Sequence, residues 1–293
     1  MNKSSFSVLG CYVLWGLLPI FWKLLANVDS VYVLAQRVLF SCIFCLAIIL
    51  LKKNGSSVKN ILKSKTERRR YFVCGILISI NWGVYILTIA IGKILEASLA
   101  YYMSPLFSVV IGALIFKEKL SAVQWISVGL ALVGVMISVI AYGNVPYLAI
   151  IIGLSFALYG AMKKTIKAES EVSICMETMS VLPLALAFIV YAQLSGYTTF
   201  SSLSNAEMLL LAASGAVTSI PLMLFAKGIR KTSITTSGIL MYINPTLQLL
   251  VGVLIYNEVF TKMNAITFAF VWAAVILFVL DSLRKHRKHK VKA

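Results

Sequence analysis

The chain has 293 residues, of which 60% are hydrophobic and 13% charged, and its formal net charge is +17. An ordinary soluble protein has an apolar share of about 45–50% and a charged share of about 25%. The composition therefore excludes a soluble globular protein and predicts an all-α membrane protein that crosses the bilayer many times.

Ten apolar stretches of roughly 18–23 residues are long enough to cross a bilayer as helices. The first runs on without a small-residue cleavage site, so we expect it to be a membrane helix rather than a signal peptide. The linkers are short except 52–70 and 194–206, which leaves no room for a soluble nucleotide-binding domain. The predicted spans lie at 5–25, 31–51, 71–91, 97–116, 122–141, 146–163, 172–193, 207–226, 234–256 and 263–282.

The basic residues alternate with these spans. All but four of the 27 Lys and Arg residues fall in segments on one side of a ten-helix topology, the exceptions being Lys23, Arg37, Lys93 and Lys262. By the positive-inside rule, both termini are predicted to be cytoplasmic, in an inner or plasma membrane. The basic tail 284–293 is expected to bind anionic lipid headgroups rather than nucleic acid, because no folded basic domain accompanies it.

One segment occurs twice, since residues 94–118 align with 234–258 without a gap at an offset of 140. Each half of the chain holds five spans, an odd number, so the second half is predicted to enter the membrane inverted. We expect a first five-helix repeat at 1–141 and a second at 146–283, with Glu118 at the cytoplasmic side and Glu258 at the outer side. The identities are Ile94/Ile234, Tyr102/Tyr242, Pro105/Pro245, Gly112/Gly252, Leu114/Leu254, Ile115/Ile255 and Glu118/Glu258.

Four prolines within the spans are candidate helix breaks. Proline lacks an N–H and displaces the carbonyl four residues earlier, and such a freed carbonyl is tolerated in a membrane where protein or a water-lined cavity receives it. The alternative is a kink that packs against a neighbouring helix. These prolines are Pro19, Pro105, Pro221 and Pro245.

Aromatic and amide side chains recur along single faces of several predicted helices. Such faces could together line an aromatic cavity with a few hydrogen-bonding groups, as small-molecule sites commonly have. For any single aromatic residue, packing is the alternative, and Trp22, Trp125 and Trp272 are expected to be interfacial or lipid-facing anchors. The candidate cavity residues are Tyr12, Trp15, Asn81, Tyr85, Tyr101, Ser104, Ser108, Tyr159, Tyr242, Asn244 and Gln248.

Ionisable residues inside spans are costly and therefore informative. Arg37 lies in the second span and Glu177, 140 residues later, in the seventh. Glu177 could bind and release a proton during transport, or it could form a salt bridge with Lys163 or Lys164. Lys93 and Glu96, at a short outer turn, are expected to be solvated.

Enzymatic chemistry finds no support in the sequence. The five cysteines lie inside predicted spans, where they act as small hydrophobes, and both histidines lie in the basic tail. We find no Ser/His/Asp set, metal-ligand cluster or glycine-rich phosphate loop, and therefore expect no enzyme, metal or cofactor.

Several segments resemble the RarD group of the EamA family, in the drug/metabolite transporter superfamily. The resemblance implies ten helices, an inverted repeat, and export or import of small metabolites by alternating access. Arg37 and Glu177 match charged positions of that group, whereas Tyr32 and Gln36 stand where it has Glu and His, which weakens the case for ion coupling there. The segments are YVLWGLLP at 12–19, NWGVY at 81–85, EASLAYY at 96–102, QW at 124–125, LYG at 158–160 and YINPTLQ at 242–248.

We therefore expect a secondary active transporter, an exporter, that carries a small organic solute by alternating access around an aromatic cavity. An amino acid, an aromatic metabolite or an amphipathic drug fits a lining that is aromatic and amide-rich. Proton coupling through Glu177 is one hypothesis, and an uncoupled facilitator or exchanger is its alternative. A non-transporting membrane sensor or scaffold is the third reading. The expected partners are the lipid bilayer and the solute, with the chain as a monomer or homodimer.

Overall fold

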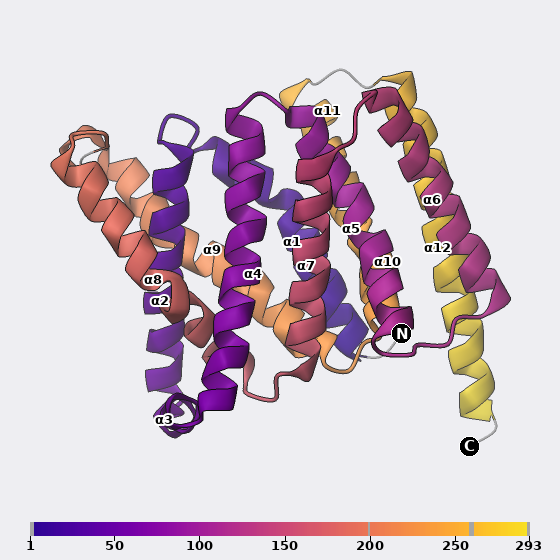
Figure 1. The fold of residues 1–293 in the computed structure, drawn as a ribbon, viewed down its shortest axis with the longest axis horizontal. Helices are drawn as coiled ribbons and strands as arrows, with labels where there is room; N and C mark the ends of the chain where they lie inside the picture. Colours follow the sequence, from indigo (N-terminus) through magenta and orange to yellow (C-terminus); the bar gives the residue numbers. More distant parts are fainter. Residues whose placement is uncertain (1–2, 199, 258–260, 292–293) are drawn as a thin grey trace.

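The computed structural model describes residues 3–198, 200–257 and 261–291, and this part of the chain is helical between short turns, without strands (Figure 1). The helices are α1 Lys3–Lys23, α2 Ser30–Leu51, α3 Gly55–Lys63, α4 Lys65–Ala90, α5 Ile94–Leu114, α6 Ala122–Tyr142, α7 Tyr147–Thr165, α8 Ser170–Leu194, the short 3₁₀ helix η1 Phe200–Ser202, α9 Asn205–Ile229, α10 Ile234–Met241, α11 Ile243–Tyr256 and α12 Lys262–Val291.

Ten segments in the described ranges are long and apolar enough to cross a bilayer, which confirms the all-α fold with ten spans. Two details differ from the sequence prediction. The linker at 52–70 contains the short helix α3, and the span predicted at 234–256 consists of two helices, α10 and α11. We call the end of the bundle where α1 begins and α3 lies the basic end, and the other the opposite end.

Polar caps fix where several of these helices begin and end, because the first N–H and last C=O groups of a helix have no partner within it. Ser121 and Gln124 form a reciprocal capping box at the start of α6, and the Ser233 side chain accepts from Thr236 N at the start of α10. Gly143 after α6 and Asn257 after α11 adopt the left-handed conformation, with φ of 79° and 56°, that commonly closes a helix.

Helix breaks occur at one of the four predicted proline sites. α10 ends at Met241 and α11 begins at Ile243, just before Pro245. The prediction is wrong for Pro19, Pro105 and Pro221, because α1, α5 and α9 continue through them. A proline removes only one intrahelical hydrogen bond, so the bonds on either side can hold the helix together.

Helix packing follows a regular scheme. α6 and α12 lie side by side at one edge of the bundle, and α2, α8 and α9 pack together at the other edge (Figure 1). The helix contacts correspond when the two halves of the chain are exchanged, with α9 in place of α4, α1 in place of α7 and α2 in place of α8. α4 packs on α7 and α8, and α9 packs on α1 and α2. α5 likewise packs on α7 as α10 and α11 do on α1.

The two repeated segments approach each other closely where α5 and α10 pack. A Cβ added to Gly238 would lie 2.7 Å from Ser108 Cβ and 2.9 Å from Pro105 O, and one added to Gly112 would lie 2.6 Å from Thr235 Oγ1. Small residues of this kind let the backbones of membrane helices pack tightly. Glycine is therefore required on both helices of this contact.

Candidate functional site

A cavity of about 710 Å³ lies between helices of the two halves of the chain. α1, α2, α4 and α5 supply one part of its wall, and α7, α10 and α11 supply the other. Its lining includes Ala26 and Val28 after α1, Ile89 near the end of α4 and Tyr256 at the end of α11. Ala26 and Ile89 are exposed, so the cavity reaches the surface at the opposite end. Its volume is typical of a small-molecule site.

Polar groups in the wall come mainly from residues that the sequence assigns to the cavity. Gln248 Nε2 donates to Asn244 Oδ1 at 2.7 Å, and Asn81 Nδ2 donates to Ile152 O at 2.7 Å. The wall thus combines amide groups with aromatic rings. Seven of the eleven candidate residues lie in it: Trp15, Asn81, Tyr85, Tyr101, Ser104, Asn244 and Gln248.

The other four candidates, Tyr12, Ser108, Tyr159 and Tyr242, lie outside the wall of this cavity. The hydroxyl of Tyr12 bonds to Ser237 Oγ at 2.8 Å, Tyr242 donates to Tyr102 O at 3.2 Å, and Ser108 donates to Ser104 O at 3.0 Å. Tyr159 donates to a carboxylate oxygen of Glu177 at 3.0 Å. These side chains lie on the predicted helix faces, but at depths where helices pack against each other.

Aromatic rings close the cavity toward the basic end. Trp15 and Phe156 line it, with ring centroids 5.5 Å apart, and Phe225 packs beneath Phe156 at 5.6 Å. Tyr159 stacks on Phe225 at 6.0 Å, with an interplanar angle of 13°. This cluster separates the cavity from the polar residues nearer the basic end.

Arg37 faces the cavity between two indole rings. Its guanidinium carbon lies 4.4 Å from the centroid of Trp22 and 4.6 Å from that of Trp82, and its Nε donates to Thr218 Oγ1 at 3.1 Å. Trp22, in the last turn of α1, also lines the cavity, and its expected role as an interfacial anchor stays a prediction. Trp82 and Lys23 line it too and were missed, although Trp82 adjoins the candidate Asn81 in sequence.

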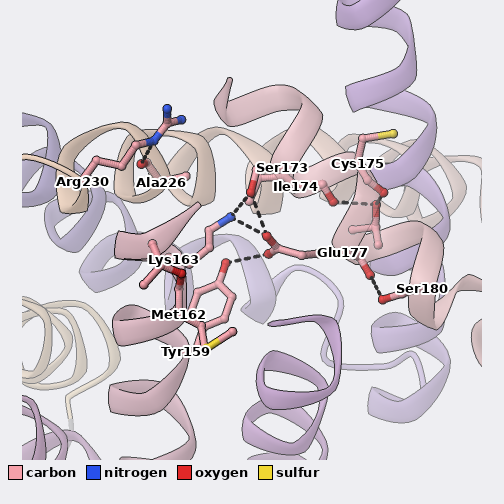
Figure 2. Close-up of polar contacts among 12 residues, drawn as sticks. Tyr159, Met162, Lys163, Ser173, Ile174, Cys175, Glu177, Ser180, Ala226 and Arg230 are labelled. Carbon is pink, nitrogen blue, oxygen red and sulfur yellow. Dashed lines mark hydrogen bonds and ion pairs between the residues drawn. The ribbon is translucent and has the colours of Figure 1, made fainter. Parts of the chain in front are cut away.

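Glu177 lies in a buried cluster of polar contacts (Figure 2). This cluster is nearer the basic end, and Glu177 is not part of the cavity wall. Lys163 Nζ approaches Glu177 Oε1 at 2.6 Å, and Ser173 Oγ donates to the same oxygen at 2.9 Å. The Tyr159 hydroxyl donates a hydrogen bond to the second carboxylate oxygen of Glu177. The salt bridge that the sequence offered as one reading of Glu177 is present, whereas its role in proton coupling stays a prediction.

A second carboxylate joins the two halves at the basic end. The two oxygens of Glu118 accept from Ile234 N at 2.7 Å and from Thr235 N at 2.9 Å, which are donors at the start of α10. Lys164 Nζ donates to Thr232 O beside them. A carboxylate at a helix N-terminus satisfies unpaired N–H groups and interacts favourably with the helix dipole. Glu258, the repeat counterpart of Glu118, lies outside the described residues.

Glu96 differs from its predicted solvated state. Its side chain is 1% exposed and accepts from Tyr142 OH at 2.8 Å and from Leu148 N at 2.7 Å, while Lys93 lies 3.3 Å away and is half exposed. The free N–H at the start of α7 explains the burial, because it provides a donor for the carboxylate. The prediction was therefore wrong for Glu96.

Fold and cavity together define a class of protein: a multi-pass membrane protein whose helices enclose a solute-sized cavity between two similar halves. Within the described ranges, no group of three or more His, Cys, Asp or Glu side chains is placed to hold a metal ion. The EamA-like transporter family matches the chain twice, over residues 2–140 and 145–280. The chain belongs to this family and is a membrane transporter.

Similar proteins agree with this assignment. "Uncharacterized transporter YojE" of Bacillus subtilis is 39% identical over 283 residues, which cover 95% of this chain and 94% of that protein. "Protein RarD" of Streptomyces exfoliatus is 34% identical, covering 97% of this chain and 90% of that one, and the resemblance to the RarD group is thereby confirmed. A solved crystal structure with 18% identity has a TM-score of 0.74 over 95% of this chain and 98% of that one, which supports the fold.

Proposed function

We propose that this chain is a secondary transporter that exports a small organic solute by alternating access. One observation carries the proposal: the cavity reaches the surface at the opposite end and is closed toward the basic end by the Trp15 and Phe156 cluster. A site between two halves, accessible from one side at a time, is the arrangement that alternating access requires. In this structure the site faces the opposite end.

An inverted repeat, with units at 1–141 and 146–283, would supply the second state. The corresponding helix contacts of the two halves support it, as does the family match to each half. The distribution of basic residues favours a cytoplasmic basic end, so the cavity would face outward here. Exchange of the conformations of the two halves would then close the outer side and open the cytoplasmic side.

Glu118 is the proposed closing contact on the cytoplasmic side. Its bonds to Ile234 N and Thr235 N hold the end of α5 against the start of α10. Glu258 occupies the same position in the second repeat, and Ile94 corresponds to Ile234. We expect Glu118 to release α10 in the inward-facing state.

The buried ion pair favours an uncoupled facilitator over proton coupling through Glu177. Glu177 has Lys163 as a counter-charge at 2.6 Å, and both side chains lie outside the cavity wall. Protonation of Glu177 would leave the Lys163 ammonium without its partner inside the bundle, which is costly. Glu177→Gln separates the two readings, because only a coupled transporter would lose its response to a pH gradient.

Transport in proteoliposomes tests the proposal. A thermal-shift screen against small metabolites selects ligands, since binding to the folded state raises its apparent stability. Ile86→Trp, in the cavity wall, should abolish transport of the selected ligand. Leu87→Trp, at the neighbouring and 51% exposed position, is the matched control and should retain transport. If none of a broad panel is moved, the chain is a sensor or scaffold and the proposal fails.

A further inference from the structure

We infer that the transported solute carries an anionic group, typically a carboxylate, on an aromatic or apolar body, and that Arg37 binds this group. The inference rests on the proposed function, since it names the class of solute that the cavity of that transporter would accept. It narrows the expected solutes, because it disfavours amphipathic cations.

The charges of the cavity wall are unbalanced. Among the described residues, its lining includes Arg37 and Lys23 but no Asp or Glu. Two described carboxylates already have other partners: Glu96 binds Tyr142 and Leu148 N, and Asp29, beside the lining residue Val28, accepts from the Tyr197 hydroxyl. A cleft with charge of one sign and low-dielectric walls concentrates the field, so this cavity attracts anions and repels cations.

Arg37 is held so that part of its guanidinium faces the cavity. The indoles of Trp22 and Trp82 lie 4.4 Å and 4.6 Å from its central carbon, and Nε is used by Thr218. Within the described residues the guanidinium makes its hydrogen bond through Nε, and its two Nη groups make none. A guanidinium presents N–H donors in a planar fork that matches the two oxygens of a carboxylate. A bound carboxylate would therefore complete the hydrogen bonding of a cation that the protein leaves partly unsatisfied.

Lys23 extends the positive potential to the mouth of the cavity. Its Nζ lies 5.4 Å from the centroid of the Tyr256 ring, at the end where the cavity reaches the surface. Lys23 and Arg37 thus mark a path from the opening into the site. Charges placed in this way raise the rate at which an oppositely charged solute enters.

The remaining wall suits an aromatic or apolar body. Tyr85 and Tyr101 meet edge to face at 5.7 Å, and Trp15 and Phe156 form the floor. Gln248 and Asn244 add an amide pair that bears no charge. An ammonium group would find aromatic faces and amide oxygens here, but no described carboxylate, so a monoanion fits better than a zwitterion or a cation.

Three ligands with one carbon skeleton test the inference: 3-phenylpropionate, 3-phenylpropionamide and 3-phenylpropylamine, which are anionic, neutral and cationic. Binding to the purified protein in detergent is measured by calorimetry, together with a panel of other aryl and alkyl carboxylates and their amides. We expect the carboxylates to bind about tenfold tighter than their amides or more, as a charge-assisted hydrogen bond provides. Equal binding of acid and amide across the panel, or binding of none of the acids, would overturn the inference.

Substitutions assign the preference to Arg37. Arg37→Gln should remove the difference between acid and amide while amide binding stays, and Arg37→Lys should keep part of it. Lys23→Gln, near the exposed mouth of the cavity, should slow association with the acid. This variant is the substitute test if Arg37→Gln does not fold. Persistence of the full preference in Arg37→Gln contradicts the assignment.

Transport assays separate this inference from the proposed function. Carboxylate binding that depends on Arg37 without any transport in proteoliposomes would refute the transporter proposal and leave the ligand class standing. Transport of neutral or cationic solutes without any preference for anions would refute the anionic ligand class and support the transporter proposal.

Discussion

Arg37 and Glu177 are two charged side chains within the spans, and they differ in how their charge is balanced. Glu177 has Lys163 at 2.6 Å and two hydroxyl donors, whereas Arg37 has two indole faces and the Thr218 hydroxyl. A balanced, fully bonded pair can support the fold, while a cation without a protein counter-charge favours an anionic ligand. The two residues share an offset of 140 in sequence but have different chemical surroundings.

Breaking the Lys163–Glu177 pair should destabilise the fold. Glu177→Gln leaves a buried ammonium without its counter-charge, and the loss in unfolding free energy should be about 3–5 kcal/mol. The double variant Lys163→Met with Glu177→Gln removes both charges and should recover most of that loss. Thermal unfolding in detergent measures both effects.

Glu67→Gln is the control for this pair, since it removes a carboxylate from a partly exposed ion pair with Arg70. Exposed pairs contribute about 0–1 kcal/mol, so its stability should stay near that of the wild type. A Glu177→Gln variant as stable as the wild type would show that the buried pair contributes nothing.

Sequence periodicity finds the face of a helix but not the depth of each residue along the bundle. Tyr12 and Tyr159 lie on the same faces as residues that line the cavity, yet they pack below its floor. Trp22 was assigned to the interface because tryptophan is enriched there, and its place beside Arg37 in the cavity wall was missed. The depth of the tyrosines and the position of Trp22 both depend on which helices pack together. A single sequence does not contain this information.

At the scale of elements, the segments that contain Pro105 and Pro245 differ, because the second is divided into α10 and α11. α5 continues through Pro105, whereas Tyr242 interrupts the helix before Pro245. Tyr242 N donates to Ile239 O, and Thr246 N reaches Tyr242 O only at 3.4 Å. Weak bonding at this point gives the second segment a site at which it can bend.

Pro245→Ala should therefore slow transport more than Pro105→Ala does. Alanine restores an N–H that can bond to Met241 O, which would join α10 and α11 into one stiffer helix. We expect a several-fold lower transport rate with an unchanged or higher melting temperature. Initial rates in proteoliposomes measure the effect, with Pro105→Ala as the matched control. Equal rates for the two variants would argue against bending at Tyr242.

Loss of the Glu118 carboxylate should open the basic end. Glu118→Ala removes the acceptor for Ile234 N and Thr235 N, so these amides should exchange with solvent faster. Hydrogen–deuterium exchange of a peptide covering 232–241 measures this. Glu67→Ala, in the first turn of α4, is the control and should leave the peptide unchanged. Unaltered exchange in Glu118→Ala would show that this contact does not hold the end closed.

Length and hydropathy were enough to predict the ten spans, because a helix needs about 20 apolar residues to cross a bilayer. They were not enough for α3 or for the division at Tyr242. α3 is too short and too polar to register as a span, and the effect of a proline depends on its neighbours, as the different outcomes at Pro105 and Pro245 show.

At the scale of the whole molecule, the distribution of basic residues predicts an orientation that fusion proteins can test. A fluorescent protein fused after the last residue should mature in the cytoplasm and fluoresce. Alkaline phosphatase fused at Asn144, in the turn between α6 and α7 at the opposite end, should be exported and active. Phosphatase fused at Lys53, after α2, is the control and should be inactive. The reverse pattern would place the cavity mouth in the cytoplasm.

Orientation and ligand charge together predict how transport responds to voltage. A membrane potential that is negative inside raises the free energy of a monoanion inside the cell by about 2.3 kcal/mol per 100 mV. At equilibrium this difference corresponds to an outside concentration about fifty times the inside one. An uncoupled facilitator for anions would therefore be an exporter without any proton coupling. In proteoliposomes loaded with 3-phenylpropionate, a potassium diffusion potential that is negative inside should speed efflux.

Glu177→Gln should leave this voltage response unchanged if the pair with Lys163 is structural. Movement of the anion together with one proton would be electrically neutral, so efflux would then follow the pH gradient and ignore the voltage. That result would contradict uncoupled export. Glu177 would then again be the candidate residue for carrying the coupled proton, because it is a buried carboxylate that lies between the cavity floor and the basic end. The response to voltage and pH in the same vesicles thus decides what drives export.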